Sequence, residues 1–291
     1  MPRGLDHIVH AVRDLDAAAE FYRRAGFTVG ARNRHAWGTH NRLVQLKDFY
    51  IEILTVAEPE KIVPHSPLSF SFGAFHRDFL DHKQGLDMIL LNSEDAIVDA
   101  RSFETAKIGN SEVFDFAREG FKPDGTPVKL AFSLVFASDP RSPEVAFAAC
   151  QHHFPENFWN PDFQTHLNGA RSVPGAVMVA EKPADHRTFL EAFTGVGASL
   201  PNPASVTIRT ANGNIDVVRA TSFRDKFGVP PQIEGEGMTL NGLRIAVDEL
   251  DRVEALLQRH DVASRRHGRC LTVSPDAACG ATLIFETPEQ G

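Results

Sequence analysis

The strongest constraint on the fold of this 291-residue chain is an internal repeat. The string GLDHIVHAVRDLDAA begins at Gly4, and GLDMILLNSEDAIVDA begins at Gly85, 81 residues later. A third copy, GAVMVAEKPADHRTFLEAFTG, begins at Gly175, and a fourth, NGLRIAVDELDRVEALLQRHDV, at Asn241. The first and fourth copies are clear and the other two are looser. Repetition of this kind predicts that one supersecondary unit is built four times.

The first copy shows what that unit is. Residues 5–12 are apolar and rich in β-branched side chains, which predicts a strand. Residues 14–25 have an apolar stripe at helical spacing, with Asp14 as the N-cap and Gly26 at the end. Further strands are predicted at 27–31, 42–47 and 49–56. The unit is therefore a βαβββ module.

A single module of this kind leaves sheet edges and one sheet face uncovered, so the modules are expected to pair. Two modules placed edge to edge give a curved mixed sheet, with helices on its convex face and a cavity on its concave face. The sequence therefore predicts an α+β fold of four βαβββ modules in two cup-shaped half-barrels. Residues 155–174, rich in Pro and Asn, are predicted to separate a first half-barrel at 1–160 from a second at 170–288.

Composition limits the partners of the chain. The net charge is −8, which disfavours nucleic acid or an anionic membrane as the main partner. No run reaches the roughly 18 apolar residues of a membrane span. Three cysteines without a CxxC pair argue against a disulfide framework. We expect a cytoplasmic protein with a small-molecule partner, and either a monomer or a homodimer paired through edge strands.

Two polar side chains stand inside apolar strands. His7 is expected to share a strand face with Leu5 and Val9, and Glu52 with Tyr50. A carboxylate buried in such a strand is costly unless a metal ion or another cation lies beside it. His7 and Glu52 are therefore candidate metal ligands, with hydrogen-bonded core residues as the alternative.

Four strings resemble the vicinal oxygen chelate superfamily, which includes glyoxalases, extradiol dioxygenases and antibiotic-resistance proteins. They are LDHIVHAVRDLDAAAEFYRRAGFTV, RHAWGTHNRLVQLKDFYIEILTV, CQHHFPENFW and HLNGA, and the first two cover the first module. Within the superfamily, the chain resembles the glyoxalase-like domain family. In the superfamily, first-strand and fourth-strand side chains of paired modules converge on a metal in the concave cavity. His7 and Glu52 fall on those positions.

A third metal ligand must come from elsewhere in the second module. That module has Met88 in place of His7, and methionine is a poor ligand for a hard divalent ion. His152 and His153 are adjacent, so at most one of them faces inward from an extended strand. The resemblance favours His152, because the family shows a CQH pattern there. The predicted site is His7, Glu52 and His152 around Zn²⁺, Fe²⁺, Mn²⁺ or Ni²⁺.

Other polar residues are candidates for substrate chemistry. His40 is the candidate general acid or base, with His153 and His166 left open as alternatives. Asn41, His166 and Trp159 are candidate substrate-binding residues. The alternative for His40 and Asn41 is an ordinary turn, and for His166 and Trp159 an anchored connection between the halves.

The repeat also predicts a difference between the two halves. Met178 and Ile245 stand where the first module has His7, so no metal is expected in the second half-barrel. Glu286 takes the place of Glu52 and is expected to be hydrogen-bonded or ion-paired. Two functions remain: a metal-dependent lyase, isomerase or dioxygenase acting on a small molecule with adjacent oxygens, or a metal-free protein that binds or sequesters a small molecule.

Overall fold

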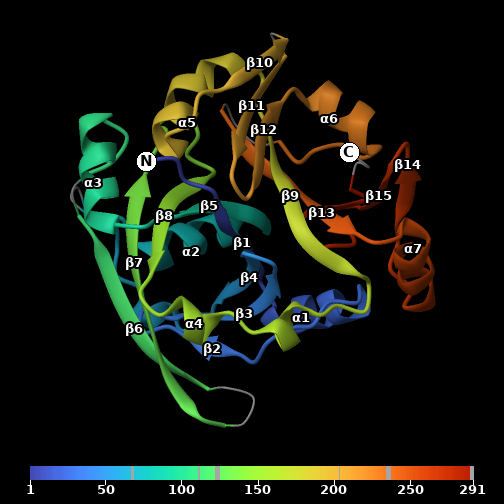
Figure 1. The fold of residues 1–291 in the computed structure, drawn as a ribbon, viewed down its shortest axis with the longest axis horizontal. Coiled ribbons are helices and arrows are strands. Elements are labelled where there is room, and N and C mark those ends of the chain that lie inside the picture. The colour runs from blue at the N-terminus through green and yellow to red at the C-terminus, as the bar shows by residue number, and fades with distance from the viewer. Residues whose placement is uncertain (67–68, 111, 122–124, 203, 234–236, 289–291) are drawn as a thin grey trace.

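The first half of the computed structural model is one eight-stranded mixed sheet (Figure 1). The structure describes residues 1–291 except 67–68, 111, 122–124, 203, 234–236 and 289–291. The strands are β1 (Leu5–Ala11), β2 (Asn33–Arg34), β3 (Thr39–Leu46), β4 (Phe49–Val56), β5 (Gly85–Asn92), β6 (Phe114–Phe121), β7 (Pro127–Ala137) and β8 (Ala146–His152). The helices are α1 (Leu15–Arg24), α2 (Phe72–His82) and α3 (Ala96–Thr105). The strand order is β2-β3-β4-β1-β5-β8-β7-β6.

The second half repeats this arrangement. Its strands are β9 (Ala170–Val179), β10 (Ser199–Asn202), β11 (Ser205–Thr210), β12 (Gly213–Val218), β13 (Thr239–Val247), β14 (Arg265–His267), β15 (Cys270–Val273) and β16 (Thr282–Glu286). Its helices are α5 (Arg187–Thr194), α6 (Ala220–Phe227) and α7 (Leu250–Arg259), and α4 (Pro155–Phe158) precedes β9. The order β10-β11-β12-β9-β13-β16-β15-β14 matches that of the first sheet.

The pairing of strands confirms the predicted modules. In each module the last strand runs parallel to the first, as β4 does to β1 and β8 to β5. The two first strands of each half, β1 with β5 and β9 with β13, pair antiparallel at the centre of the sheet. The α+β fold with two half-barrels is therefore confirmed. Whether the two halves fold as separate domains stays a prediction.

One continuous hydrophobic core joins the convex faces of the two sheets to the helices α1, α3, α5 and α7. The predicted cap of α1 is present, because the Asp14 carboxylate accepts hydrogen bonds from the amides of Asp16 and Ala17. The buried side chains of α1, among them Leu15 and Tyr22, then pack onto the sheet. Since both halves contribute to the same core, their convex sides are fixed against each other.

Three features differ from the sequence prediction. The short strand expected at 27–31 lies instead at β2, because only Asn33 and Arg34 pair with β3. The helices α2 and α6 were not predicted, since they lie in the connections between modules. Both are on concave rather than convex faces: Phe72 of α2 joins the inner cluster of the first sheet, and Phe223 of α6 that of the second.

No helix in the described part of the chain is long and apolar enough to cross a membrane.

Besides sharing a hydrophobic core, the two halves meet at polar contacts. His10 of β1 accepts a hydrogen bond from the Tyr22 hydroxyl at Nδ1 and donates from Nε2 to the carbonyl of Cys279, at 2.9 Å each. Next to Cys279, Gly280 has φ +90°, and a Cβ there would lie 1.9 Å from the carbonyl oxygen of Gln84.

The buried contact of His10 makes folding stability depend on pH. Burial lowers the pKa of His10 to about 4, while an unfolded histidine titrates near 6.5. Below about 6.5 the unfolded chain therefore binds a proton that the folded protein does not. We expect this residue to make the free energy of unfolding fall by about 2–3 kcal/mol as the pH drops from 6.5 to 4, and to contribute fully above 6.5.

Urea unfolding of the wild type and of His10→Gln across this pH range measures that contribution. Glutamine retains a donor and an acceptor but does not titrate. The stability of the variant relative to the wild type should rise as the pH falls, and parallel curves would contradict the assignment.

Candidate functional site

The concave face of the first sheet encloses a narrow cavity of about 40 Å³. Its wall is mostly aromatic and apolar, and His7, His35, Asn41, Glu52 and Arg118 are polar exceptions. A wider chamber of about 580 Å³ adjoins it, with Leu43, Arg118 and Phe158 lining both. The chamber lies between β2–β3, the β6–β7 hairpin and the segment around α4. The half-barrel therefore has a small inner end and a larger outer compartment.

His7 is held in one orientation by contacts on both ring nitrogens. Its Nδ1 donates to Asp6 Oδ2 at 2.5 Å, and its Nε2 accepts from the Tyr50 hydroxyl at 3.2 Å. The Tyr50 ring stacks on the imidazole with centroids 4.1 Å apart. Tyr50 lies directly opposite His7 because β1 and β4 pair in that register. The Nε2 lone pair is therefore directed to the cavity side.

Glu52 is held by a second polar chain. Asn41 Nδ2 donates to Glu52 Oε1 at 2.6 Å, and Asn33 Nδ2 donates to Asn41 Oδ1 at 2.8 Å. The other carboxylate oxygen, Oε2, lies 3.8 Å from His7 Nε2. Both side chains are buried, His7 at 4% and Glu52 at 8% exposure. The imidazole and the carboxylate thus face each other on the wall of one cavity.

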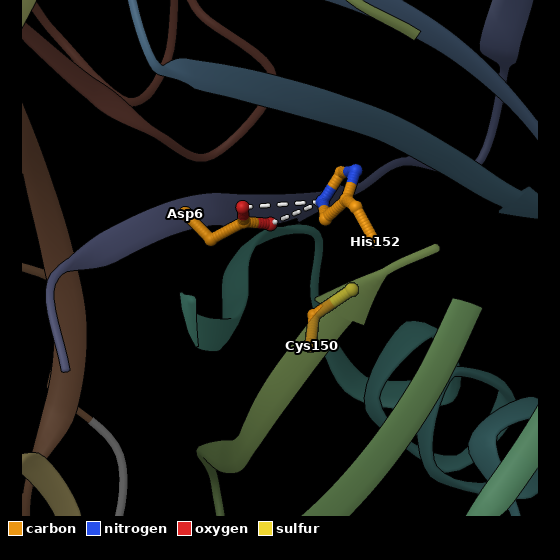
Figure 2. A group of neighbouring side chains, drawn as sticks. All are labelled: Asp6, Cys150 and His152. Carbon is orange, nitrogen blue, oxygen red and sulfur yellow. Dashed lines mark hydrogen bonds and ion pairs between the residues drawn. The ribbon is translucent and has the colours of Figure 1, made fainter. Parts of the chain in front are cut away.

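Asp6 connects His7 to His152. His152 Nε2 lies 3.2 and 3.3 Å from the two oxygens of Asp6. Figure 2 shows this contact, with the Cys150 side chain extending toward it. Ligand atoms of Asp6, Cys150 and His152 lie within 4.8 Å of one another, which makes them a second candidate metal group. His152 Nδ1 is buried and has no hydrogen-bond partner among the described residues. His153 turns away and contacts the Ser133 hydroxyl at 2.7 Å.

Sequence reasoning missed Asp6 because β1 is not a regular strand. The register of β1 against β5 shifts between Leu5 and His7, which marks a β-bulge. Leu5 consequently packs in the convex core rather than on the face of His7, and Asp6 reaches the concave side. A signal was present: the Leu-Asp pair recurs as Leu86-Asp87, and Asp87 also binds a histidine, His76, at 2.6 Å.

The other residues predicted from the sequence to take part in substrate chemistry lie in different parts of the structure. His40 contacts Glu58 at 3.1 Å and is not among the residues that line the cavity or the chamber. His166 accepts from the Thr28 amide and donates to the Gln45 carbonyl, so it joins the connection before β9 to β3. Trp159 lines the chamber and stacks on His152, with centroids 5.9 Å apart. Their roles in substrate chemistry stay predictions.

Burial and neighbouring charges set the protonation of the groups at the site. Burial acts to raise the pKa of Asp6, but the imidazoles of His152 and His7 outweigh it and hold that pKa well below its usual range. Burial raises the pKa values of Tyr50 and Cys150 well above their usual ranges, and nearby carboxylates add to this. Burial lowers the pKa of His35 to about 4. At neutral pH the site therefore holds an ionised Asp6, a neutral phenol, a neutral thiol and a neutral His35.

The residues present fit a divalent ion. An ion binds imidazole nitrogen and carboxylate oxygen at about 2.0–2.2 Å, so donors 3.8 Å apart, as His7 Nε2 and Glu52 Oε2 are, can both reach one ion between them. A carboxylate on the far nitrogen of a metal-binding histidine is a recurring support, and Asp6 takes that place.

In the second half-barrel an arginine is ion-paired with two carboxylates. Arg244 of β13 binds Glu286 through two hydrogen bonds, of 2.7 and 3.1 Å, and Asp216 through one of 3.2 Å. The expected ion pair of Glu286 is therefore confirmed, with Arg244 as its partner. The Phe223 and Phe227 rings of α6 pack in the inner cluster of this sheet.

Two eight-stranded half-barrels, each of two βαβββ modules, define the vicinal oxygen chelate fold. The sequence profile described as "Glyoxalase-like domain" matches residues 5–194, and the chain belongs to that family. No curated protein matches the chain.

Solved structures share the fold at low sequence identity. A hypothetical protein from Staphylococcus aureus is 13% identical with a TM-score of 0.69, covering 98% of this chain and 100% of that one. A triple mutant of 4-hydroxymandelate synthase from Streptomyces coelicolor is 11% identical with a TM-score of 0.59, covering 100% and 94%. A 2,2',3-trihydroxybiphenyl 1,2-dioxygenase from Sphingomonas wittichii is 12% identical with a TM-score of 0.51, covering 99% and 91%.

Proposed function

We propose that the protein is a divalent-metal-dependent enzyme, a lyase, isomerase or dioxygenase, acting on a small oxygenated molecule in the first half-barrel. One observation carries the proposal: His7 Nε2 and Glu52 Oε2 lie 3.8 Å apart, both buried, on the wall of the same cavity. An enzyme of this kind needs such a donor pair next to space for a substrate. The similarity to a 4-hydroxymandelate synthase and to a dioxygenase, at 11% and 12% identity, agrees with the fold and leaves the reaction open.

The protein side chains have separate tasks in this proposal. His7 and Glu52 hold the ion, with His152 as the third ligand predicted from the sequence, while Asp6 and Asn41 keep the donor atoms of His7 and Glu52 in place. A bound ion supplies Lewis acidity toward a substrate oxygen. The Tyr50 hydroxyl, which stays protonated at neutral pH, donates to His7 Nε2; an ion on that nitrogen would leave this hydroxyl free to donate a hydrogen bond to a ligand in the inner cavity.

Metal binding by the full-length protein tests the proposal. After removal of bound ions by a chelator, the chain is dialysed against Zn²⁺, Mn²⁺, Ni²⁺ or, without oxygen, Fe²⁺, and the bound metal is counted. We expect one ion per chain for at least one metal. Clearly substoichiometric binding of all four would contradict it.

Asp6→Asn tests the support of the metal ligand. An amide at this position is neutral and has one acceptor oxygen instead of two. The charged acceptor that His7 and His152 share is therefore lost, and His7 is no longer held in a fixed orientation. We expect metal affinity to fall by roughly 10–100-fold, measured by competition with a chromophoric chelator. If Asp6 only stabilised the fold, the variant would have a lower melting temperature and unchanged metal affinity.

The second candidate is a metal-free protein that binds or sequesters a small molecule. The chamber of about 580 Å³ with its aromatic wall is the observation that favours it. Metal binding distinguishes the two, because ligand binding in this second case is independent of any ion and insensitive to changes at His7 and Glu52.

A further inference from the structure

We propose that Arg118 of β6 recognises a carboxylate of the substrate, so that the ligand of this half-barrel is an organic acid with an apolar body. Only the placement of the ligand's reacting end rests on the proposed function, and recognition of the carboxylate does not. Arg118 lines both the inner cavity and the outer chamber, so its guanidinium lies where the two compartments meet. A ligand that reaches the cavity from the chamber must pass it.

The protein leaves most of this guanidinium without a partner. Arg118 donates one hydrogen bond, from Nη1 to the carbonyl of Glu119 at 3.3 Å, and forms no ion pair with any residue that the structure describes. A guanidinium has five N–H donors in a planar fork that matches a carboxylate. The cation in the second half-barrel, Arg244, is instead held by Asp216 and Glu286. The unused donors of Arg118 are therefore available to a ligand.

The charge of Arg118 stands out among the residues around it. Arg118 is the only Arg or Lys among the described residues that line the inner cavity. Tyr50 and Glu52 line the same inner cavity as Arg118. Burial lowers the pKa of Arg118, and Tyr50 and Glu52 act in the opposite direction. With an ion bound to Glu52, the ion and Arg118 together give the cavity a positive potential, and an anionic group of a ligand complements that potential.

The rest of the chamber indicates the body of the ligand. Apolar side chains from three segments line it: Leu43, Phe121, Val128, Leu130, Trp159 and Phe163. Phe121 and Phe163 are exposed, at 68% and 37%, although they border a concave surface. An aromatic or acyl group covers such a surface. The proposed ligand is thus an organic acid with three parts. Its carboxylate binds Arg118, its apolar body lies in the chamber, and its reacting, oxygenated group lies in the inner cavity.

A matched pair of probes tests the recognition without metal. The metal-stripped full chain is titrated calorimetrically with 3-phenylpropanoate and with 3-phenylpropanamide, which have the same body and differ in charge. We expect the wild type to prefer the carboxylate by roughly 10–100-fold. Arg118→Gln should reduce the preference to less than about threefold, and Arg118→Lys should leave an intermediate value, since it retains the charge without the fork.

Arg101→Gln, which removes an exposed charge from helix α3 and lines neither compartment, is the matched control and should retain most of the preference. Unfolding midpoints confirm that each variant folds. The proposal is overturned if the wild type binds neither probe or binds both equally, if Arg118→Gln retains the preference, or if Arg101→Gln loses it to the same extent. Because no ion is present, these outcomes are independent of whether His7 and Glu52 bind metal.

Discussion

His7→Ala is expected to abolish binding of the divalent ion while leaving a folded protein. The change removes one of the two donor atoms that face each other at 3.8 Å and leaves Glu52 as a single carboxylate. Loss of a protein ligand should weaken binding by more than the 10–100-fold expected for loss of its supporting carboxylate. Metal content is measured by elemental analysis after dialysis of untagged protein.

His153→Ala is the matched control for this prediction. His153 is also a histidine near the half-barrel, but it binds Ser133 and not Asp6. It should retain the full metal content, and both variants should keep the circular dichroism of the wild type. Unchanged metal occupancy in His7→Ala would remove His7 from the site. Metal loss in Cys150→Ser with none in His7→Ala would instead favour the group of Asp6, Cys150 and His152.

Arg244→Met is expected to destabilise the second half-barrel by about 3–5 kcal/mol. Arg244 is 17% exposed, and its ion-pair partners Asp216 and Glu286 are 13% and 16% exposed. Methionine has a similar length but no charge, so two buried carboxylates lose their cation and repel each other. Urea unfolding at neutral pH, followed by circular dichroism, measures the change.

A control variant makes this prediction specific. Arg209→Met replaces an exposed arginine of β11 and should change the stability by less than about 0.5 kcal/mol. A loss below 1 kcal/mol at neutral pH, or an equal loss in Arg209→Met, would contradict the ion-pair explanation.

The parts of the fold that repeat could be predicted from the sequence. The strand and helix of the first module follow from period-two and helical patterns, and the recurrence of Gly4 at Gly85 fixed the pairing of modules. The helices α2 and α6 could not be predicted in this way. They lie in the connections, and their place on the concave faces depends on aromatic contacts such as those of Phe72 and Phe223.

The candidate site was predictable where the strands are regular. Glu52 lies on β4, which pairs with β1 without a break and sets Glu52 opposite Val9, so its place on the same sheet face as His7 followed from the alternation. Asp6 lies at a bulge, where alternation fails. Arg118 was missed although the string FDFAREGF alternates and places it on the same strand face as Phe114 and Phe116. Its closeness to Glu52 depends on the curvature of the sheet, which brings β6 back toward β4.

Anomalous diffraction from crystals of the full chain loaded with Mn²⁺ or Zn²⁺ tests the central claim most directly. The peak should lie between the imidazole of His7 and the carboxylate of Glu52, within bonding distance of both. A peak bound by Asp6, Cys150 and His152 instead, or no peak in the first half-barrel under saturating metal, would contradict the account.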